Sequence, residues 1–214
     1  VFERLASEAR KKYGQNDTAL YYKVIQRAQY CYYHANEPAK AISFGEEIIR
    51  LTSTVYGETH LFHFRSLRDL ALIYDQQENF LASESLFKQA WQIAKNSTEI
   101  DKSDYLMLIR NFAYASIRAG NIKAAEPLFR ESIQLMRGSK GEQALELTAL
   151  LNDFGVMLSN AERYQEAEPL LKEALQLRSE LLDTNHPDYL VSLRNLAVLL
   201  ANIQKWTEAE PLYV

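Results

Sequence analysis

One short pattern returns along this chain at a constant interval of 42 residues. Its clearest copies begin at Ile122, Tyr164 and Trp206 and share the run Ala-Glu-Pro-Leu, and weaker copies begin at Phe80 and Pro38. A fixed period of this size is typical of stacked repeats, in which each unit packs against its neighbours instead of contributing to one central core. The interval therefore constrains the architecture before any single residue is considered.

The spacing of apolar residues predicts two helices in each repeat. In the fourth repeat the first helix is expected over residues 143–160 and the second over 164–182, with a short turn between them. The apolar positions of the first helix fall on one face of an α-helix: Leu147, Leu150, Leu151, Phe154 and Leu158. The corresponding helix pairs elsewhere are 18–35 with 37–55, 60–77 with 79–96, 103–119 with 121–137, and 187–204 with the start of a second helix.

These helices predict an all-α fold, a right-handed superhelical solenoid of antiparallel helix pairs that spans residues 1–214 as a single array. Residues 1–16 are expected to form the second helix of a preceding repeat. Because the sequence opens with Val1, we expect neighbouring domains in a longer chain. The repeats are then 17–58, 59–101, 102–141, 142–185 and 186–214, the last of them incomplete.

Small and large residues alternate between the paired helices. Four of the first helices carry a small residue at one shared position, and the second helices carry a large one at another. A small side chain lets two helix backbones approach closely, and a large one fills the space beside it. These positions are Ala71, Ala113, Gly155 and Ala197, and Phe87, Phe129, Leu171 and Tyr213. Gly45 in the first repeat departs from this pattern.

Two segments carry a family likeness. The run Glu-Ala-Glu-Pro-Leu at 166–170 returns at 208–212, and the loop 181–188 precedes Leu-Arg-Asn-Leu-Ala at 193–197. With the 42-residue interval, the chain resembles the kinesin-light-chain type of tetratricopeptide repeat, a longer variant of the common 34-residue repeat. The resemblance implies a scaffold that binds proteins, and it implies that Asn111 and Asn195 contact a partner peptide.

Composition argues against several classes of function. The net charge of −4 argues against nucleic acid as the main partner, because such proteins usually present a basic surface. No apolar run approaches the roughly 18 residues of a membrane span, so we expect no membrane partner. The single cysteine, Cys31, cannot form an internal disulfide, which favours a reducing compartment and a cytoplasmic location.

No catalytic motif is present in the sequence. There is no His-Glu-x-x-His, no phosphate-binding glycine loop and no Cys-x-x-Cys, so we expect neither an enzyme nor a cofactor site. His60 and His63 are three residues apart and could share a metal ion, but the sequence offers no third ligand. We therefore expect no metal site and place the two histidines in a loop and a helix start.

The candidate binding residues lie on the first helices of the repeats, because in stacked helix pairs these helices line a concave surface. Residues turned away from the apolar face there include more basic than acidic side chains, although the whole chain is acidic. The predicted peptide-binding groove consists of Lys23, Arg27, Tyr30, Arg65, Arg68, Arg110, Asn111, Tyr114, Arg118, Asn152, Arg194 and Asn195.

Two interpretations of this groove compete. In one, Arg68, Arg110 and Arg194 pair with carboxylates of neighbouring helices and only stabilise the stack. In the other, they form a row with asparagines and hold an extended, acidic peptide, since asparagine pairs with peptide backbone and arginine with carboxylates. We favour a protein-interaction scaffold that docks a peptide or partner domain in this groove. The alternative is a regulatory or sensing arm of a larger signalling protein with an attached effector domain.

Overall fold

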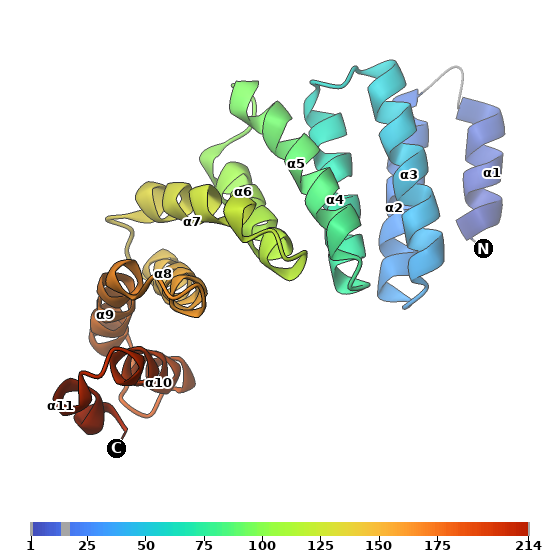
Figure 1. The fold of residues 1–214 in the computed structure, drawn as a ribbon. Helices are drawn as coiled ribbons and strands as arrows, with labels where there is room; N and C mark the ends of the chain where they lie inside the picture. The colour runs from blue at the N-terminus through green and yellow to red at the C-terminus, as the bar shows by residue number, and fades with distance from the viewer. Residues whose placement is uncertain (1, 14–17, 214) are drawn as a thin grey trace. The chain divides into compact units, whose positions relative to one another are not determined.

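Helices are the only regular secondary structure in the residues that the structure describes. The computed structural model describes residues 2–13 and 18–213. The chain is 82% helical, and the described residues hold eleven α-helices, one short 3-10 helix and no strand (Figure 1). The all-α prediction is confirmed.

The helices follow the 42-residue period. Most of the predicted helix ends lie within one or two residues of the observed ones, for example 37–55 against Pro38–Val55. The elements are α1 (Phe2–Tyr13), α2 (Thr18–His34), α3 (Pro38–Val55), α4 (Leu61–Gln76), α5 (Phe80–Asn96), α6 (Lys102–Arg118), α7 (Ile122–Met136), α8 (Glu142–Asn160), α9 (Tyr164–Leu181), α10 (Pro187–Asn202), α11 (Trp206–Ala209) and η1 (Glu210–Leu212).

The chain forms two compact units, and each is described by itself. Unit 1 is Val1–Asn121 and holds α1 to α6, and unit 2 is Ile122–Val214 and holds α7 to η1. The division falls inside the predicted third repeat, 102–141, so the single array of five repeats stays a prediction. The predicted boundary between residues 16 and 17 lies outside the described residues.

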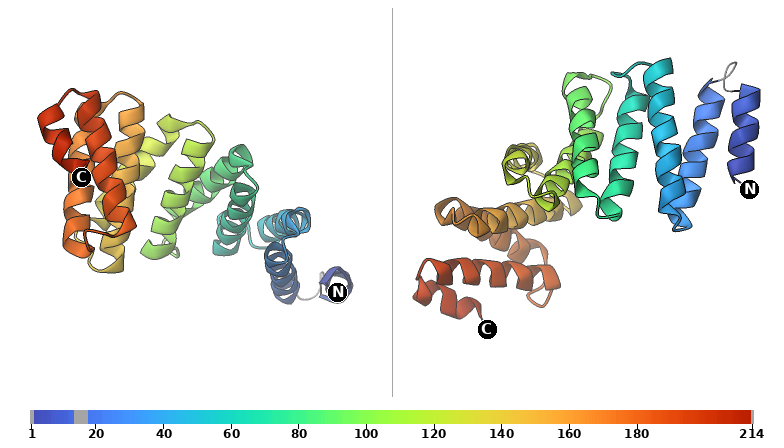
Figure 2. Two further views of the ribbon diagram at one scale, coloured as in Figure 1. Left: turned by 90° about the horizontal axis from the view of Figure 1, so that it is seen from below. Right: turned by 45° about the vertical axis from the view of Figure 1, so that its right-hand side comes forward.

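Within each unit every helix packs against the next one in the sequence. In unit 1 the contacts run from α1 to α2 and onward to α6, and in unit 2 from α7 to α11. Figure 2 shows α1 to α5, coloured blue to green, standing side by side with alternating direction. This is the predicted arrangement of antiparallel helix pairs.

The turn inside each helix pair has the same backbone conformation in every repeat. The residue at the turn has a positive φ: Asn36, Glu78, Gly120, Glu162 and Gln204, with angles of 57°, 57°, 79°, 59° and 60°. The next residue donates its N–H to a carbonyl five residues back, as from Glu37 to Tyr32 at 2.9 Å. This bond closes the helix end and reverses the chain, as in a Schellman motif. The backbone φ angle at the turn thus repeats with the same 42-residue period as the sequence.

Small and large residues meet at the predicted positions. A Cβ added at Gly155 would lie 2.7 Å from Cγ of Leu171, so α8 and α9 touch where only glycine fits. Phe129 of α7 stacks on Phe154 of α8 with ring centroids 5.5 Å apart, and both rings are buried. The alternation predicted from the sequence is therefore the packing rule of unit 2.

Pro127 and Pro169 lie inside α7 and α9, which continue past them. A proline leaves the carbonyl four residues earlier without its usual donor. Those carbonyls belong to Lys123 and Gln165, which are exposed, so solvent can satisfy them. A kink at these positions stays a prediction.

A glutamate at one position of the recurring motif, present as Glu84, Glu126 and Glu168, links its repeat to the next. Glu84 accepts from Nδ2 of Asn121 at 2.8 Å in unit 1. In unit 2, Arg163 Nη1 donates to Glu126 at 2.6 Å and Lys205 Nζ donates to Glu168 at 2.9 Å. Each partner lies 37 residues after its glutamate, directly before the next second helix. The acidic part of the motif thus has a structural role.

The Glu126 pair gives a test of this role at acid pH. Arg163, with Arg130, lowers the pKa of the Glu126 carboxyl to about 2, below its usual 4.5. A depressed folded-state pKa adds stability above pH 4.5 that is lost as the pH falls towards 2. We expect Glu126→Gln to cost about 1 kcal/mol of unfolding free energy at pH 6 and almost nothing near pH 2, because this pair is partly exposed. Urea denaturation at several pH values measures both, and an equal cost at each pH would contradict the assignment.

Candidate functional site

The predicted groove residues divide between the two units. Nine of them lie on α2, α4 and α6 of unit 1, and we call the face that they share the A-helix surface of unit 1: Lys23, Arg27, Tyr30, Arg65, Arg68, Arg110, Asn111, Tyr114 and Arg118. The other three lie in unit 2, Asn152 on α8 and Arg194 and Asn195 on α10. The two groups of residues are therefore described separately, unit by unit.

Arg68 is held by carboxylates of its own and the neighbouring first helix. Its Nη1 donates to Asp104 of α6 at 2.8 Å, and its Nε and Nη2 donate to Asp69 at 3.2 and 3.1 Å. The side chain is only 16% exposed, and its guanidinium lies over the ring of Phe64. Burial raises the pKa of Asp69, and the charge of Arg68 opposes that shift. For Arg68 the structure supports the interpretation that it stabilises the stack.

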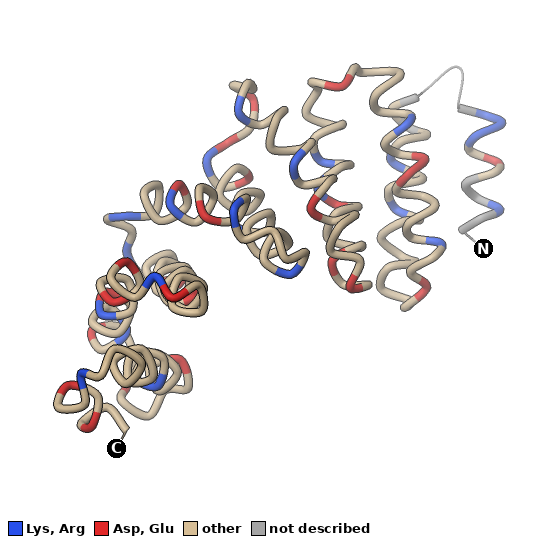
Figure 3. Tube along the Cα trace, in the orientation of Figure 1, with Lys and Arg blue, Asp and Glu red and all other residues tan. Residues whose placement is uncertain are grey.

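Arg118 is paired in a similar way at the end of α6. Its Nη2 lies 2.7 Å from Oδ2 of Asp75, and its guanidinium stands over the ring of Phe80. Burial raises the pKa of Asp75, whose other oxygen, Oδ1, is buried without a hydrogen bond. Figure 3 shows basic and acidic positions interspersed within unit 1. The basic excess counted from the sequence is thus offset locally at Arg68 and Arg118.

The exposed part of the A-helix surface lies on α2. Lys23 and Arg27 are exposed, and Tyr30 is 54% exposed. The guanidinium of Arg27 lies over the Tyr30 ring at 5.3 Å, and the ring of His34 lies 4.2 Å from it on the same helix. Arg110, Asn111 and Tyr114 on α6 are half-buried. A ligand that reaches this surface meets an aromatic ring with a cation above it.

A cavity opens beside Tyr30, between α2 and α4. Its volume is about 170 Å³, and it is lined by Gln29, Tyr30, Tyr33, Asp69, Leu72 and Ile73. Most of this lining is apolar or aromatic. The Nε2 atom of Gln29 is buried and has no hydrogen-bond partner. The cavity is thus bordered by apolar and aromatic side chains and by two polar residues, Gln29 and Asp69.

The structure corrects the sequence analysis at Asn152. The sequence placed its side chain outward, but it is buried, with 4% exposed. Its Oδ1 accepts from Nδ2 of Asn195 at 3.0 Å and from Ser192 at 3.4 Å, and its Nδ2 donates to Asp153 at 3.1 Å. The reason is that α10 packs over α8 and its side chains cover this amide. Asn152 and Asn195 therefore bind each other, whereas Arg194 is exposed.

A buried arginine that the sequence analysis did not single out completes this network. Arg178 of α9 is 5% exposed. It donates to Thr148 of α8 at 3.0 Å, and to the carbonyl of Asp188 and the hydroxyl of Ser192 on α10, each at 2.7 Å. Since Ser192 also contacts Asn152, one chain of hydrogen bonds joins α8, α9 and α10. These polar groups position helices of unit 2 instead of facing a ligand.

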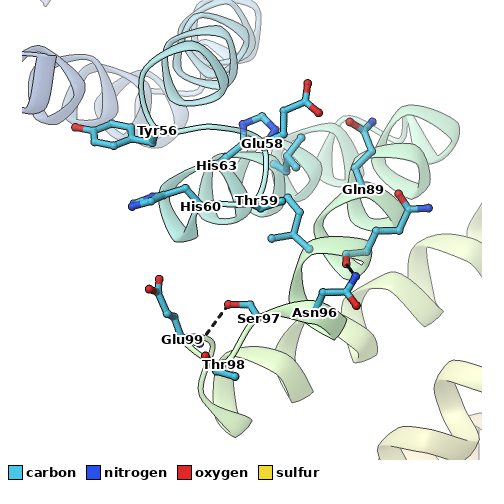
Figure 4. A pocket seen from close by; sticks show the side chains of 13 residues that line it. Tyr56, Glu58, Thr59, His60, His63, Gln89, Asn96, Ser97, Thr98 and Glu99 are labelled. Carbon is cyan, nitrogen blue, oxygen red and sulfur yellow. Dashed lines mark hydrogen bonds between the residues drawn. The ribbon is translucent and has the colours of Figure 1, made fainter.

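A larger cavity of about 770 Å³ lies at the turns before α4 and after α5 (Figure 4). Several of its polar groups already serve the fold. His60 caps α4 by accepting from the N–H of Phe62, and Nδ1 of His63 bonds the hydroxyl of Thr52 at 3.1 Å. Asn96 donates to the carbonyl of Gln92, and burial lowers the pKa of His63. These contacts support the loop and helix-start interpretation of the two histidines.

The described residues contain no group of three potential metal ligands from histidine, cysteine, aspartate and glutamate. None of the described helices has the length and hydrophobicity that a membrane span requires.

The fold defines a class, a stack of antiparallel helix pairs with a 42-residue period. A family model described as tetratricopeptide repeat matches residues 26–96 and 145–214. The chain belongs to the tetratricopeptide repeat family, and the resemblance stated from the sequence is confirmed. Repeats of this family are in general scaffolds for protein–protein interaction. The comparison with curated proteins finds no match.

Solved structures with this fold have low sequence identity to the chain. The kinesin-light-chain-type repeats of a Podosopora anserina protein are 19% identical, with 89% of this chain and 90% of that chain covered and a TM-score of 0.73. BtubC (BKLC) from P. vanneervenii is 18% identical, with 99% and 85% covered and a TM-score of 0.71. The apo form of RapI is 15% identical, with 90% and 67% covered and a TM-score of 0.70. At such identities the likeness concerns the fold alone.

Proposed function

We propose that the chain binds a peptide segment of a partner protein on the A-helix surface of unit 1, without catalysis. The observation that carries this proposal is the cavity between α2 and α4, which is bordered by Tyr30. Exposed tyrosines are favoured at protein interfaces because one end of the ring is apolar and the other is polar. An apolar side chain of the partner would enter the cavity beside this ring.

Charge around the cavity favours an acidic residue next to that apolar one. Arg27 stands over the Tyr30 ring and Lys23 is exposed one helical turn earlier, whereas Arg68 is already paired with Asp69 and Asp104. The acidic character expected of the partner therefore depends on Lys23 and Arg27. Exposed ion pairs contribute little each, so the apolar contact supplies most of the affinity.

Peptides selected from a random 12-residue library against the full 214-residue chain provide the test. We expect Tyr30→Ala to weaken the binding of the best selected peptide at least tenfold. Truncation of a central aromatic anchor typically costs about 2 kcal/mol or more of binding free energy. Fluorescence anisotropy of labelled peptide measures the affinity. Tyr213→Ala is the matched control, since Tyr213 is 58% exposed in unit 2 and should not matter. Peptides that bind Tyr30→Ala as tightly as the wild type would refute the proposed site.

A further inference from the structure

The cavity of about 770 Å³ at the turns before α4 and after α5 is separate from the surface that the proposed function uses. It shares no lining residue with the cavity beside Tyr30. Its described lining includes two exposed carboxylates, Glu58 and Glu99, but no lysine or arginine. Neither carboxylate pairs with a cation of the described residues. The negative charge of this cavity is therefore not balanced from within the described chain.

One of the buried residues in the lining is a histidine. His63 lies in the first turn of α4 and is 6% exposed. Figure 4 shows it beside Glu58, whereas Glu99 comes from the turn after α5. The other first helices carry a tyrosine or a leucine at the position of this histidine: Tyr21, Tyr105, Leu147 and Tyr189. The repeat that borders the cavity thus has a titratable polar ring where the others have a core residue.

The hydrogen bonds of His63 show which of its nitrogens is an acceptor. Its Nδ1 lies 3.1 Å from the hydroxyl of Thr52, and that hydroxyl donates its one proton to the carbonyl of Ile48 at 2.9 Å. Nδ1 is therefore the donor, and Nε2 keeps a lone pair, since burial lowers the pKa of His63 and the ring is neutral at pH 7. Nε2 has no partner among the described residues, and it is not one of the unpartnered atoms closed off from solvent. Because Nδ1 faces α3, the edge that lines the cavity is the one with Nε2.

The rest of the lining adds further acceptors and a flat wall. Gln89 and Gln92 contribute exposed side-chain amides, and the ring of Tyr56 stacks on that of His60 with centroids 5.0 Å apart. Carboxylate, amide and imidazole acceptors on several sides suit a cation that carries many N–H groups. A guanidinium has five such donors in one plane and stacks on aromatic rings, whereas an ammonium is a compact, strongly hydrated charge.

We propose that this cavity binds a guanidinium group, with Glu58 and Glu99 balancing its charge and Nε2 of His63 accepting one of its N–H groups. An arginine side chain of a partner protein and a free guanidino compound both carry this group. The inference goes beyond the proposed function, which places a peptide at other residues, so each can fail without the other. Glu58 and Glu99 are exposed, and exposed ion pairs contribute little each, so the affinity depends on both carboxylates acting together.

The test compares two probes of the same shape, N-acetyl-arginine N-methylamide and its uncharged analogue N-acetyl-citrulline N-methylamide. Binding to the full 214-residue chain is followed by NMR chemical-shift titration. We expect the arginine probe to shift resonances of residues 56–63 and 89–99 and to bind about tenfold more tightly than the citrulline probe. The double variant Glu58→Gln/Glu99→Gln should weaken the arginine probe about tenfold and leave the citrulline probe unchanged. Both substitutions lie on the surface and keep the size of the side chain.

Glu78→Gln/Glu162→Gln is the matched control, because it removes the same total charge from two exposed turns. Glutamine already occupies the equivalent turn position at Gln204, so the control should fold and bind the arginine probe like the wild type. An equal loss in this control would mean that only the overall charge attracts the probe, and the inference would be wrong. Equal binding of the citrulline probe by the wild type, or shifts confined to the residues around Tyr30, would also overturn it.

His63→Leu tests the acceptor at the base of the cavity. Leucine occupies the equivalent position at Leu147, so the variant should fold, and it should weaken the arginine probe about fivefold through the loss of one hydrogen bond. N-acetyl-lysine N-methylamide separates shape from charge, and binding as tight as that of the arginine probe would overturn the guanidinium assignment. Methylguanidinium identifies the source. Binding as tight as that of the arginine probe supports a free guanidino compound, and weaker binding supports an arginine of a partner protein.

Discussion

Replacing Arg178 with alanine should lower the free energy of unfolding by about 3 kcal/mol, because its buried guanidinium joins three helices of unit 2. It donates to Thr148, to the carbonyl of Asp188 and to Ser192. The substitution removes all three hydrogen bonds and leaves an internal space where the side chain lay. Urea denaturation followed by circular dichroism measures the loss, and hydrogen exchange shows where it occurs. Protection should fall in α8, α9 and α10 and stay unchanged in α2 to α5.

Arg137→Ala is the control for this prediction. Arg137 belongs to the same unit and pairs with Glu173 at 2.8 Å, but its side chain is 56% exposed. Exposed ion pairs contribute about 0–1 kcal/mol, so this substitution should have a small effect. Arg178→Met removes the hydrogen bonds but keeps a long side chain, so it separates the effect of volume from that of hydrogen bonding. Methionine is also the residue at the equivalent position of the third repeat, Met136. If Arg178→Met is as stable as the wild type, the hydrogen bonds contribute nothing net and only packing matters at this site.

Much of the fold could be predicted because the period carries so much information. The position of each residue within the 42-residue repeat indicates in which helix it lies and whether its side chain faces the core. The turn residues show how far this reaches: Asn36, Glu162 and three others share one backbone conformation. The exposed state of Lys23, Arg27 and Tyr30 also follows from their phase.

The phase does not show which side chains of the next helix cover a given face. Arg68 and Asn152 occupy equivalent positions and were both placed in an open groove. Asp104 lies beside Arg68, and Ser192 and Asn195 cover Asn152. The offset between partners was a usable signal, because Arg68 and Asp104 are 36 residues apart and the glutamate pairs of the motif 37 apart. In such a repeat, an oppositely charged residue 36 or 37 positions further along the chain is thus the first partner to consider.

The Arg178 network was also visible in part. Position 178 is equivalent to Ala94 and Met136, so a charged residue there stands out. Thr148 likewise occupies the position of Phe64 and Leu106. When one repeat has polar residues at two positions that are apolar in the other repeats, as Arg178 and Thr148 are, a hydrogen bond between them is expected. What the sequence cannot supply is the third partner, since the carbonyl of Asp188 lies in the first turn of α10 and its position depends on how α10 packs.

Replacing Phe129 with alanine should destabilise the protein by about 3–5 kcal/mol, the largest effect we expect from a single substitution. Phe129 is 0% exposed, and its ring is nearly parallel to that of Phe154, at 4°. The loss combines the transfer of a large apolar side chain with the space it leaves between α7 and α8. Phe129→Leu should cost only about 1 kcal/mol, because leucine fills the equivalent position in the next repeat at Leu171. Urea denaturation of both variants gives the comparison.

A double-mutant cycle with Phe154→Ala isolates the contact between the two rings. Stacked aromatic pairs contribute about 0.5–1.5 kcal/mol beyond their buried area, so the two costs should fall short of additivity by that amount. The Arg130 guanidinium stands over the Phe154 ring and also donates to Glu126 and Glu166. Phe154 is therefore the residue at which the core of unit 2 meets the ion pairs that link its repeats. Strict additivity of the two substitutions would mean that each ring packs independently of the other.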